Sequence, residues 1–204
     1  MKRAVAAGIL LLLLTGCGAA ETAQVEDVRA AVTVSGTLTA TQTEQSARPL
    51  TQEEVLAAYD RAVAAYTWFD LTPLNSAGES QTVNGRVYRK VEKAGLETME
   101  ELRGYLRTIF SEELTERLLA TGGETPLYIE IDGQLWAAVN GGRRRDASKG
   151  AVTLQVSQKS ETEYEVNVTT DLLEDGEVSG VQCCGFPYQW VDDRWVFTEF
   201  ELVY

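Results

Sequence analysis

The sequence predicts an α+β fold, in which about three N-terminal helices pack on a C-terminal antiparallel sheet of five or six strands. In the first half of residues 50–204, apolar side chains recur at the three- and four-residue spacing of a helix. In the second half they alternate with polar ones, as in strands that have one solvated face. Helices followed by strands, rather than alternating with them, indicate an α+β arrangement.

Each expected helix begins at a recognisable cap. Thr51 with Glu54, and Thr98 with Glu101, have the spacing of a capping box, in which each side chain bonds the other residue's main-chain N–H. Ser111 is the expected cap of a third helix. The apolar stripes behind these caps are formed by Val55, Tyr59, Val63 and Tyr66, by Leu102, Tyr105, Leu106, Ile109 and Phe110, and by Leu114, Leu118 and Leu119.

The expected strands are marked by alternation and by turn residues. A short strand is predicted at residues 86–91, between the first two helices. Residues 127–131 and 135–139 flank Asp132-Gly133, a pair that favours the positive φ angles of a tight hairpin. Further strands are expected around residues 152–156, 164–168, 178–188 and 195–203, with acidic turns between the last three.

The N-terminus has the pattern of an export signal. Lys2 and Arg3 precede an apolar run at residues 4–14, which is too short for a bilayer core that needs about 20 residues. The run ends in Leu-Thr-Gly-Cys, which resembles the lipobox of bacterial lipoproteins, whose cysteine is diacylated and becomes the new N-terminus. We therefore expect a lipoprotein signal peptide at residues 1–16 and lipidation at Cys17; the alternative is an ordinary signal peptide with an incidental cysteine.

This reading places the protein on the outer face of the cytoplasmic membrane, lipid-anchored and facing the cell wall. Two acyl chains anchor a protein stably where one does not. Residues 17–49 form the lipidated cysteine and a flexible tether, rich in Thr, Ser, Gln and Ala, with a reach of about 30 Å. Residues 50–204 then form one domain of ordinary size.

Composition excludes several functions. The chain has 18 basic and 31 acidic residues, a net charge of −13, so we expect no nucleic-acid partner. It contains no histidine, which excludes Ser-His-Asp and Cys-His nucleophile pairs and histidine-bearing zinc sites in their usual form. We therefore expect a protein that is not an enzyme and that uses neither a cofactor nor a metal.

The candidate binding residues are charged. Two acidic turns are the candidate partner-binding elements: the first contains Glu174, Asp175 and Glu177, and the second contains Asp192 and Asp193. For each, the simpler alternative is a solvated turn with no binding role. A Gly-rich loop carries Arg143, Arg144 and Arg145, and because clustered arginines bind carboxylate or phosphate, these residues are a candidate anion contact. The alternative is that they only balance the charge of an acidic surface. Aromatic residues at 186–190 are candidate anchors, with burial in the core as the alternative. The redox state of Cys183 and Cys184 stays open.

Several segments together resemble the IseA-type family of DL-endopeptidase inhibitors from Gram-positive bacteria, over about residues 50–204. These are Ala65-Tyr66-Thr67-Trp68-Phe69, Val87 to Val91, Ile109 to Glu113, Asp132 to Trp136, Asn140-Gly141-Gly142 and Asp193 to Phe200. The resemblance implies a non-enzymatic protein that blocks the active-site cleft of NlpC/P60-type peptidoglycan endopeptidases. The alternative is an NTF2-like extracytoplasmic module that holds a small molecule or a membrane complex in a deep apolar pocket.

Overall fold

Three helices and two four-stranded antiparallel sheets make up residues 46–204, the part of the chain that the computed structural model describes. The helices are α1 (Gln52–Asp70), α2 (Met99–Arg107) and α3 (Glu112–Leu119). Sheet A has the order β1-β2-β4-β3 and contains β1 (Ser76–Val83), β2 (Arg86–Val91), β3 (Tyr128–Ile131) and β4 (Gln134–Ala138). Sheet B has the order β5-β6-β7-β8 and contains β5 (Lys149–Ser160), β6 (Glu163–Glu174), β7 (Glu177–Val191) and β8 (Arg194–Phe197). The predicted signal peptide, Cys17 and most of the tether lie outside the described residues.

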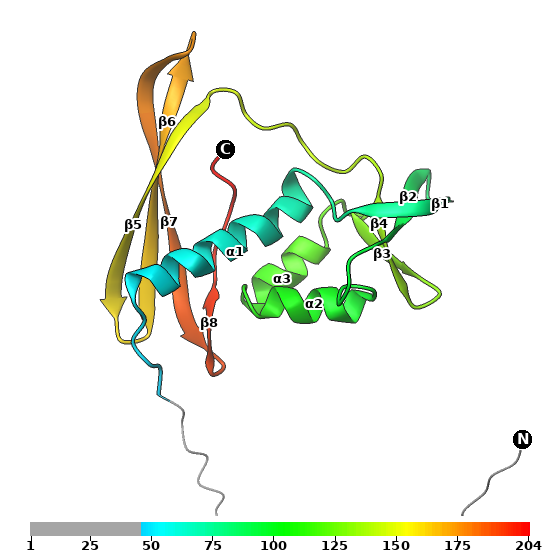
Figure 1. Ribbon diagram of the computed structural model, residues 1–204, viewed down its shortest axis with the longest axis horizontal. Helices are drawn as coiled ribbons and strands as arrows, with labels where there is room; N and C mark the ends of the chain where they lie inside the picture. The colour runs from blue at the N-terminus through cyan, green and yellow to red at the C-terminus, as the bar shows by residue number, and fades with distance from the viewer. Residues whose placement is uncertain (1–45) are drawn as a thin grey trace, which may run out of the picture. The chain divides into compact units, whose positions relative to one another are not determined.

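The α+β class is confirmed, but the predicted arrangement of its elements is wrong. The strands form two sheets rather than one sheet of five or six, and β1 and β2 come between α1 and α2. The β3–β4 hairpin pairs with β2, through Tyr88 opposite Ala138, instead of extending the later strands. Figure 1 shows the helices between the two sheets: α1 contacts β5 and β6, and α2 contacts β3.

The predicted caps and the Asp-Gly hairpin are confirmed. Both capping boxes form, at Thr51 and at Thr98, and the Ser111 side chain accepts a hydrogen bond from Leu114 N–H at the start of α3. Asp132 and Gly133 have φ angles of 51° and 71°, as the turn between β3 and β4 requires. Local signals therefore fixed where these elements begin.

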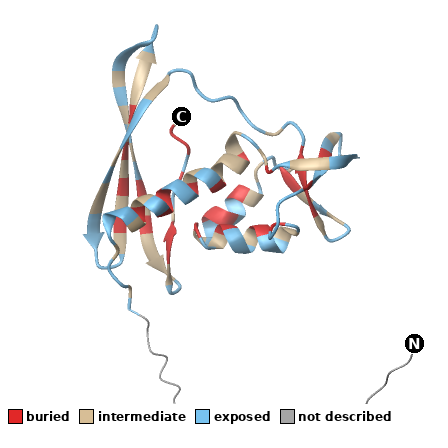
Figure 2. Ribbon diagram, in the orientation of Figure 1, coloured by how far each residue is buried: buried red, intermediate tan, exposed pale blue. Residues whose placement is uncertain are grey.

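The core joins the helices to sheet B through aromatic rings. Figure 2 shows buried residues along α1 and in the middle of sheet B. Phe200 lies at the centre, with ring centroids 4.8 Å from Phe186, 5.3 Å from Phe197 and 5.5 Å from Tyr59. The strand predicted at residues 195–203 accordingly ends at Phe197, because residues 198–204 leave the sheet and bury Phe200, Leu202 and Val203.

Candidate functional site

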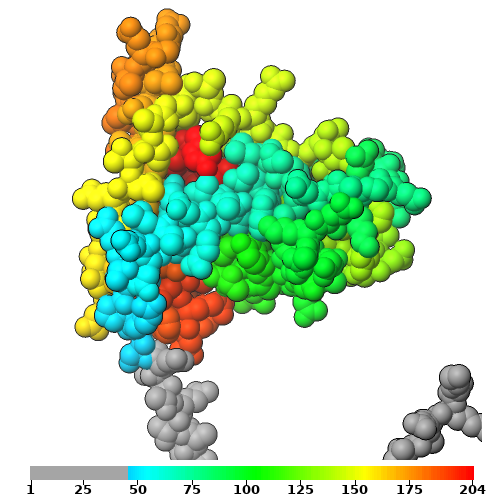
Figure 3. Space-filling model, viewed as in Figure 1, coloured from blue at the N-terminus to red at the C-terminus, as the bar shows by residue number. Residues whose placement is uncertain are grey.

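The first acidic turn is the tip of the long β6–β7 hairpin. Glu174 and Glu177 pair across its end, and Asp175 and Gly176 form the turn with φ angles of 53° and 85°. All four residues are exposed. In Figures 1 and 3 this part of the chain, drawn in orange, stands clear of the rest of sheet B. The hairpin therefore presents its carboxylates to solvent on an extended arm.

Apolar side chains accompany the carboxylates on this arm. Val178 and Val181, both on β7, are 61% and 57% exposed, the highest values among the exposed large hydrophobic residues described. Exposed apolar groups next to a charged rim are typical of protein-binding surfaces. We call Glu174, Asp175, Glu177, Val178 and Val181 the hairpin tip.

The second acidic turn does not join the first. Asp192 and Asp193 connect β7 to β8, at the opposite end of β7 from Glu177. At about 3.3 Å per residue, the 15 residues of β7 separate the two turns by roughly 50 Å. One small ligand cannot contact both, so they are two separate surfaces.

The arginine cluster is largely engaged within the protein. Arg143 Nε and Nη2 donate to the two carboxylate oxygens of Asp70 at 2.8 and 2.7 Å, and Nη2 also donates to the main-chain oxygen of Tyr204 at 3.1 Å. The Arg145 guanidinium lies 4.2 Å from the centre of the Tyr204 ring. Arg144 is the member whose side chain makes no polar contact or cation–π contact within residues 46–204. Two of the three predicted anion contacts thus hold the last residues of the chain in place.

The neighbouring cysteines are free thiols on β7. Cys183 is exposed and Cys184 is half-buried, and consecutive residues of a strand point to opposite faces. Burial raises the pKa of the Cys184 thiol, and the nearby Glu201 carboxylate raises it further. Cys184 is therefore an unreactive thiol at neutral pH.

A groove of about 760 Å³ lies at the end of sheet B opposite the hairpin tip, where α1 begins. Tyr188 and Trp190, two of the predicted aromatic anchors, line it together with Trp195. Tyr188 and Trp195 are largely buried and only their edges reach the groove, Trp190 is half-buried, and Phe186 lies in the core. The other lining residues are Ser46, Arg48, Leu50, Glu54, Ala57, Arg61 and Thr108. We call this hollow the aromatic groove.

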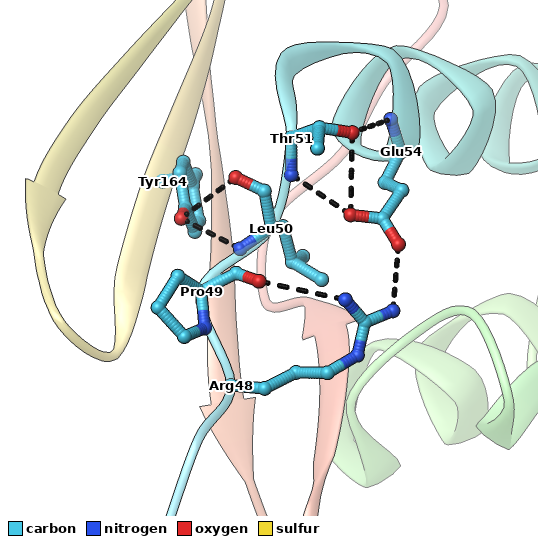
Figure 4. Close-up of polar contacts among 6 residues, drawn as sticks. All are labelled: Arg48, Pro49, Leu50, Thr51, Glu54 and Tyr164. Atoms are coloured by element: carbon cyan, nitrogen blue, oxygen red, sulfur yellow. Dashed lines mark hydrogen bonds and ion pairs between the residues drawn. The ribbon is translucent and has the colours of Figure 1, made fainter.

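One wall of the aromatic groove is held by a hydrogen-bond network (Figure 4). The Tyr164 hydroxyl accepts from Leu50 N–H at 2.9 Å and donates to Leu50 C=O at 3.1 Å, which fixes this segment to β6. Glu54 accepts from Thr51 N–H at 2.8 Å and pairs with Arg48 at 2.6 Å. The hydrogen bond from Arg48 and that from the Thr51 main chain lower the pKa of Glu54 to about 2.

This shift predicts a pH-dependent stability. Because the folded-state pKa of Glu54 lies below its ordinary value of 4.5, its contribution is complete above about pH 4.5 and is lost as the pH falls toward 2. We expect Glu54→Gln to be less stable than the wild type at pH 7, with the difference shrinking between pH 4.5 and 2.5 in urea unfolding. The control Glu53→Gln removes a charge from the same helical turn without touching Arg48, and an equal pH trend in it would contradict the assignment.

Neither a metal centre nor a membrane span emerges from residues 46–204. No group of three or more Cys, Asp or Glu side chains there is placed to hold a metal ion. No helix in this part of the chain combines the length and apolarity needed to cross a bilayer. A scan against known protein families matches none of them, and a search of the curated proteins finds no similar sequence.

Proposed function

We propose that this protein is a membrane-anchored extracytoplasmic lipoprotein that binds a peptidoglycan DL-endopeptidase and blocks its active-site cleft without covalent chemistry. The observation that carries the proposal is the hairpin tip, an exposed acidic arm with two exposed valines. A β-hairpin that extends from a sheet has a shape suited to entering a cleft. The family resemblance supplies the class of partner, and lipid on Cys17 would hold the inhibitor where that partner works.

The negative charge of the protein would steer its association with an endopeptidase whose cleft has a basic rim. Removal of residues 1–16 leaves 16 basic and 31 acidic residues, a net charge of −15. An acidic surface raises the rate at which a positively charged partner is captured, and salt reduces this gain because the Debye length is about 10 Å at 0.1 M. The valines at the tip would supply the apolar contact that keeps the complex together.

The filled core favours this proposal over the NTF2-like alternative. That alternative requires a deep apolar pocket between sheet and helices. Here the space between α1 and sheet B is occupied by Tyr59, Phe186, Phe197 and Phe200, whose ring centroids lie 4.8–6.5 Å apart in the measured pairs. The aromatic groove borders this packed region, since the Tyr188 ring lies 4.6 Å from Phe197, and it opens to solvent on the surface.

Matched charge pairs test the proposal. The purified chain is expected to slow the release of peptides from muropeptides by an NlpC/P60-type endopeptidase. Glu174→Gln/Glu177→Gln should weaken this inhibition about tenfold at low salt, whereas Asp192→Asn/Asp193→Asn, which removes two charges at the other end of β7, should change it less than threefold. Asparagine tolerates the positive φ of 48° and 60° in that turn.

Two results would count against the proposal in different ways. Undiminished peptide release at micromolar excess of the wild-type chain would reject the inhibitory function itself. Equal losses for the two double variants would show that net charge, rather than the hairpin tip, governs the inhibition. Raising the salt concentration should reduce the difference between the wild type and the hairpin variant.

A further inference from the structure

We propose that the aromatic groove is a second binding site, independent of the endopeptidase contact, for an aromatic carboxylate such as the C-terminus of a peptide that ends in an aromatic residue. The site combines a floor of aromatic rings with a cation that has no ion-pair partner among residues 46–204. Its volume of about 760 Å³ is in the range that holds small ligands.

The floor of the groove is a rigid set of rings. Trp195 stacks on Tyr188 at 5.7 Å between ring centroids and meets Trp190 edge to face at 5.8 Å. Tyr164 contacts Trp195 at 5.2 Å, and its hydroxyl also fixes Leu50 in the adjacent wall. A ligand ring can therefore stack on the half-buried Trp190 without waiting for the site to form.

The charged residues that line the groove give it a net positive charge, although the protein as a whole is acidic. Arg48 and Glu54 neutralise each other at 2.6 Å. Arg61 is exposed and forms no ion pair within the described residues. Burial raises the pKa of Tyr188, and the nearby Arg61 guanidinium offsets part of this rise. The lining residues thus leave one positive charge beside the rings.

The free hydrogen-bonding groups select an acceptor as ligand. The Glu54 carboxylate is occupied by Arg48 and by Thr51 N–H, and the Thr108 hydroxyl donates to Tyr105 C=O at 2.7 Å. A contact with the single Tyr188 hydroxyl leaves most of the five N–H donors of the Arg61 guanidinium without a partner among residues 46–204. A carboxylate accepts two parallel hydrogen bonds from such a group, whereas an amide of the same shape lacks the charge and one acceptor oxygen.

Indole NMR signals provide a test with an internal control. The chain contains four tryptophans, of which Trp190 and Trp195 line the groove, while Trp68 and Trp136 do not. Titrating the full chain with N-acetyl-phenylalanine should shift the indole N–H signals of Trp190 and Trp195 and leave those of the other two unchanged. N-acetyl-phenylalaninamide should bind at least fivefold more weakly. The tripeptide Gly-Gly-Phe and free phenylacetate separate a peptide ligand from a small free acid, since only the former gains from further peptide contacts.

Two variants connect the binding to the named groups. Arg61→Gln should abolish the preference for the acid over the amide, and Trp190→Ala should weaken the binding of both about tenfold. The control Arg117→Gln removes an exposed arginine on α3 and should bind as the wild type does. Absence of shifts at 20 mM acid, equal shifts in all four indoles, or an unchanged preference in Arg61→Gln would overturn the proposal. None of these outcomes depends on inhibition of an endopeptidase.

Discussion

Replacing Phe197 by alanine is expected to lower the free energy of unfolding by about 3–5 kcal/mol, the usual range for a buried aromatic residue. The Phe197 side chain is fully buried, with its ring 4.6 Å from Tyr188 and 5.3 Å from Phe200. Its main chain also joins sheet B to the helices, because Phe197 N–H donates to Ile109 C=O and Ser111 N–H donates to Phe197 C=O, both at 2.9 Å. Loss of the ring therefore leaves a cavity where sheet B packs against the helices, and it weakens the contact between these two layers.

Urea unfolding followed by circular dichroism measures this loss, and two controls define its origin. Phe197→Leu keeps most of the apolar volume and should cost less than about 1.5 kcal/mol, so it should be clearly more stable than the alanine variant. Val178→Ala, at a position 61% exposed on the hairpin tip, should remain within about 0.5 kcal/mol of the wild type. A loss below 1 kcal/mol for Phe197→Ala would mean that the aromatic cluster is not the main core.

Short-range signals predicted the ends of elements well. A cap needs only residues three apart, as Thr51 and Glu54 are, and both partners can be seen in one stretch of sequence. The β1–β2 hairpin was missed, although Asn84-Gly85 is a strong turn signal and adopts φ angles of 49° and 79°. The exposed β1, which carries few apolar residues, lacks the alternation that identified the other strands.

The number of sheets and the candidate sites depend on contacts that no local pattern contains. The sequence predicted both acidic turns and a strand at residues 178–188 between them, but not that β7 runs unbroken for 15 residues and so separates the turns by roughly 50 Å. The aromatic groove joins Arg48 and Arg61 to Tyr188 and Trp190, more than 120 positions later. The aromatic stretch at 186–190 was the available signal, and nothing in it indicated which basic residues would face it.

Replacing Gly142 by alanine is the second change with a large expected effect, a loss of about 2–4 kcal/mol in the free energy of unfolding. A Cβ atom at this position would lie 1.6 Å from the Leu71 carbonyl oxygen and 2.2 Å from its carbon. Both are main-chain atoms just after α1, so no side-chain rotation relieves the clash. The loop must move away, and it then loses the hydrogen bond from Arg143 N–H to Asp70 C=O at 2.8 Å.

The displaced loop would also separate charges that meet at the end of α1. Asp70 is the last residue of α1, where a carboxylate is unfavourable beside the negative end of the helix dipole, and the bidentate Arg143 compensates for it. Gly180→Ala is the matched control, because its nearest contact is an ordinary 3.9 Å to Leu172, and it should stay within about 0.5 kcal/mol. Arg143→Gln removes the ion pair alone and should destabilise the protein less than Gly142→Ala does. A larger loss in Arg143→Gln would mean that the ion pair, rather than the close main-chain approach at Gly142, is what mainly stabilises this loop.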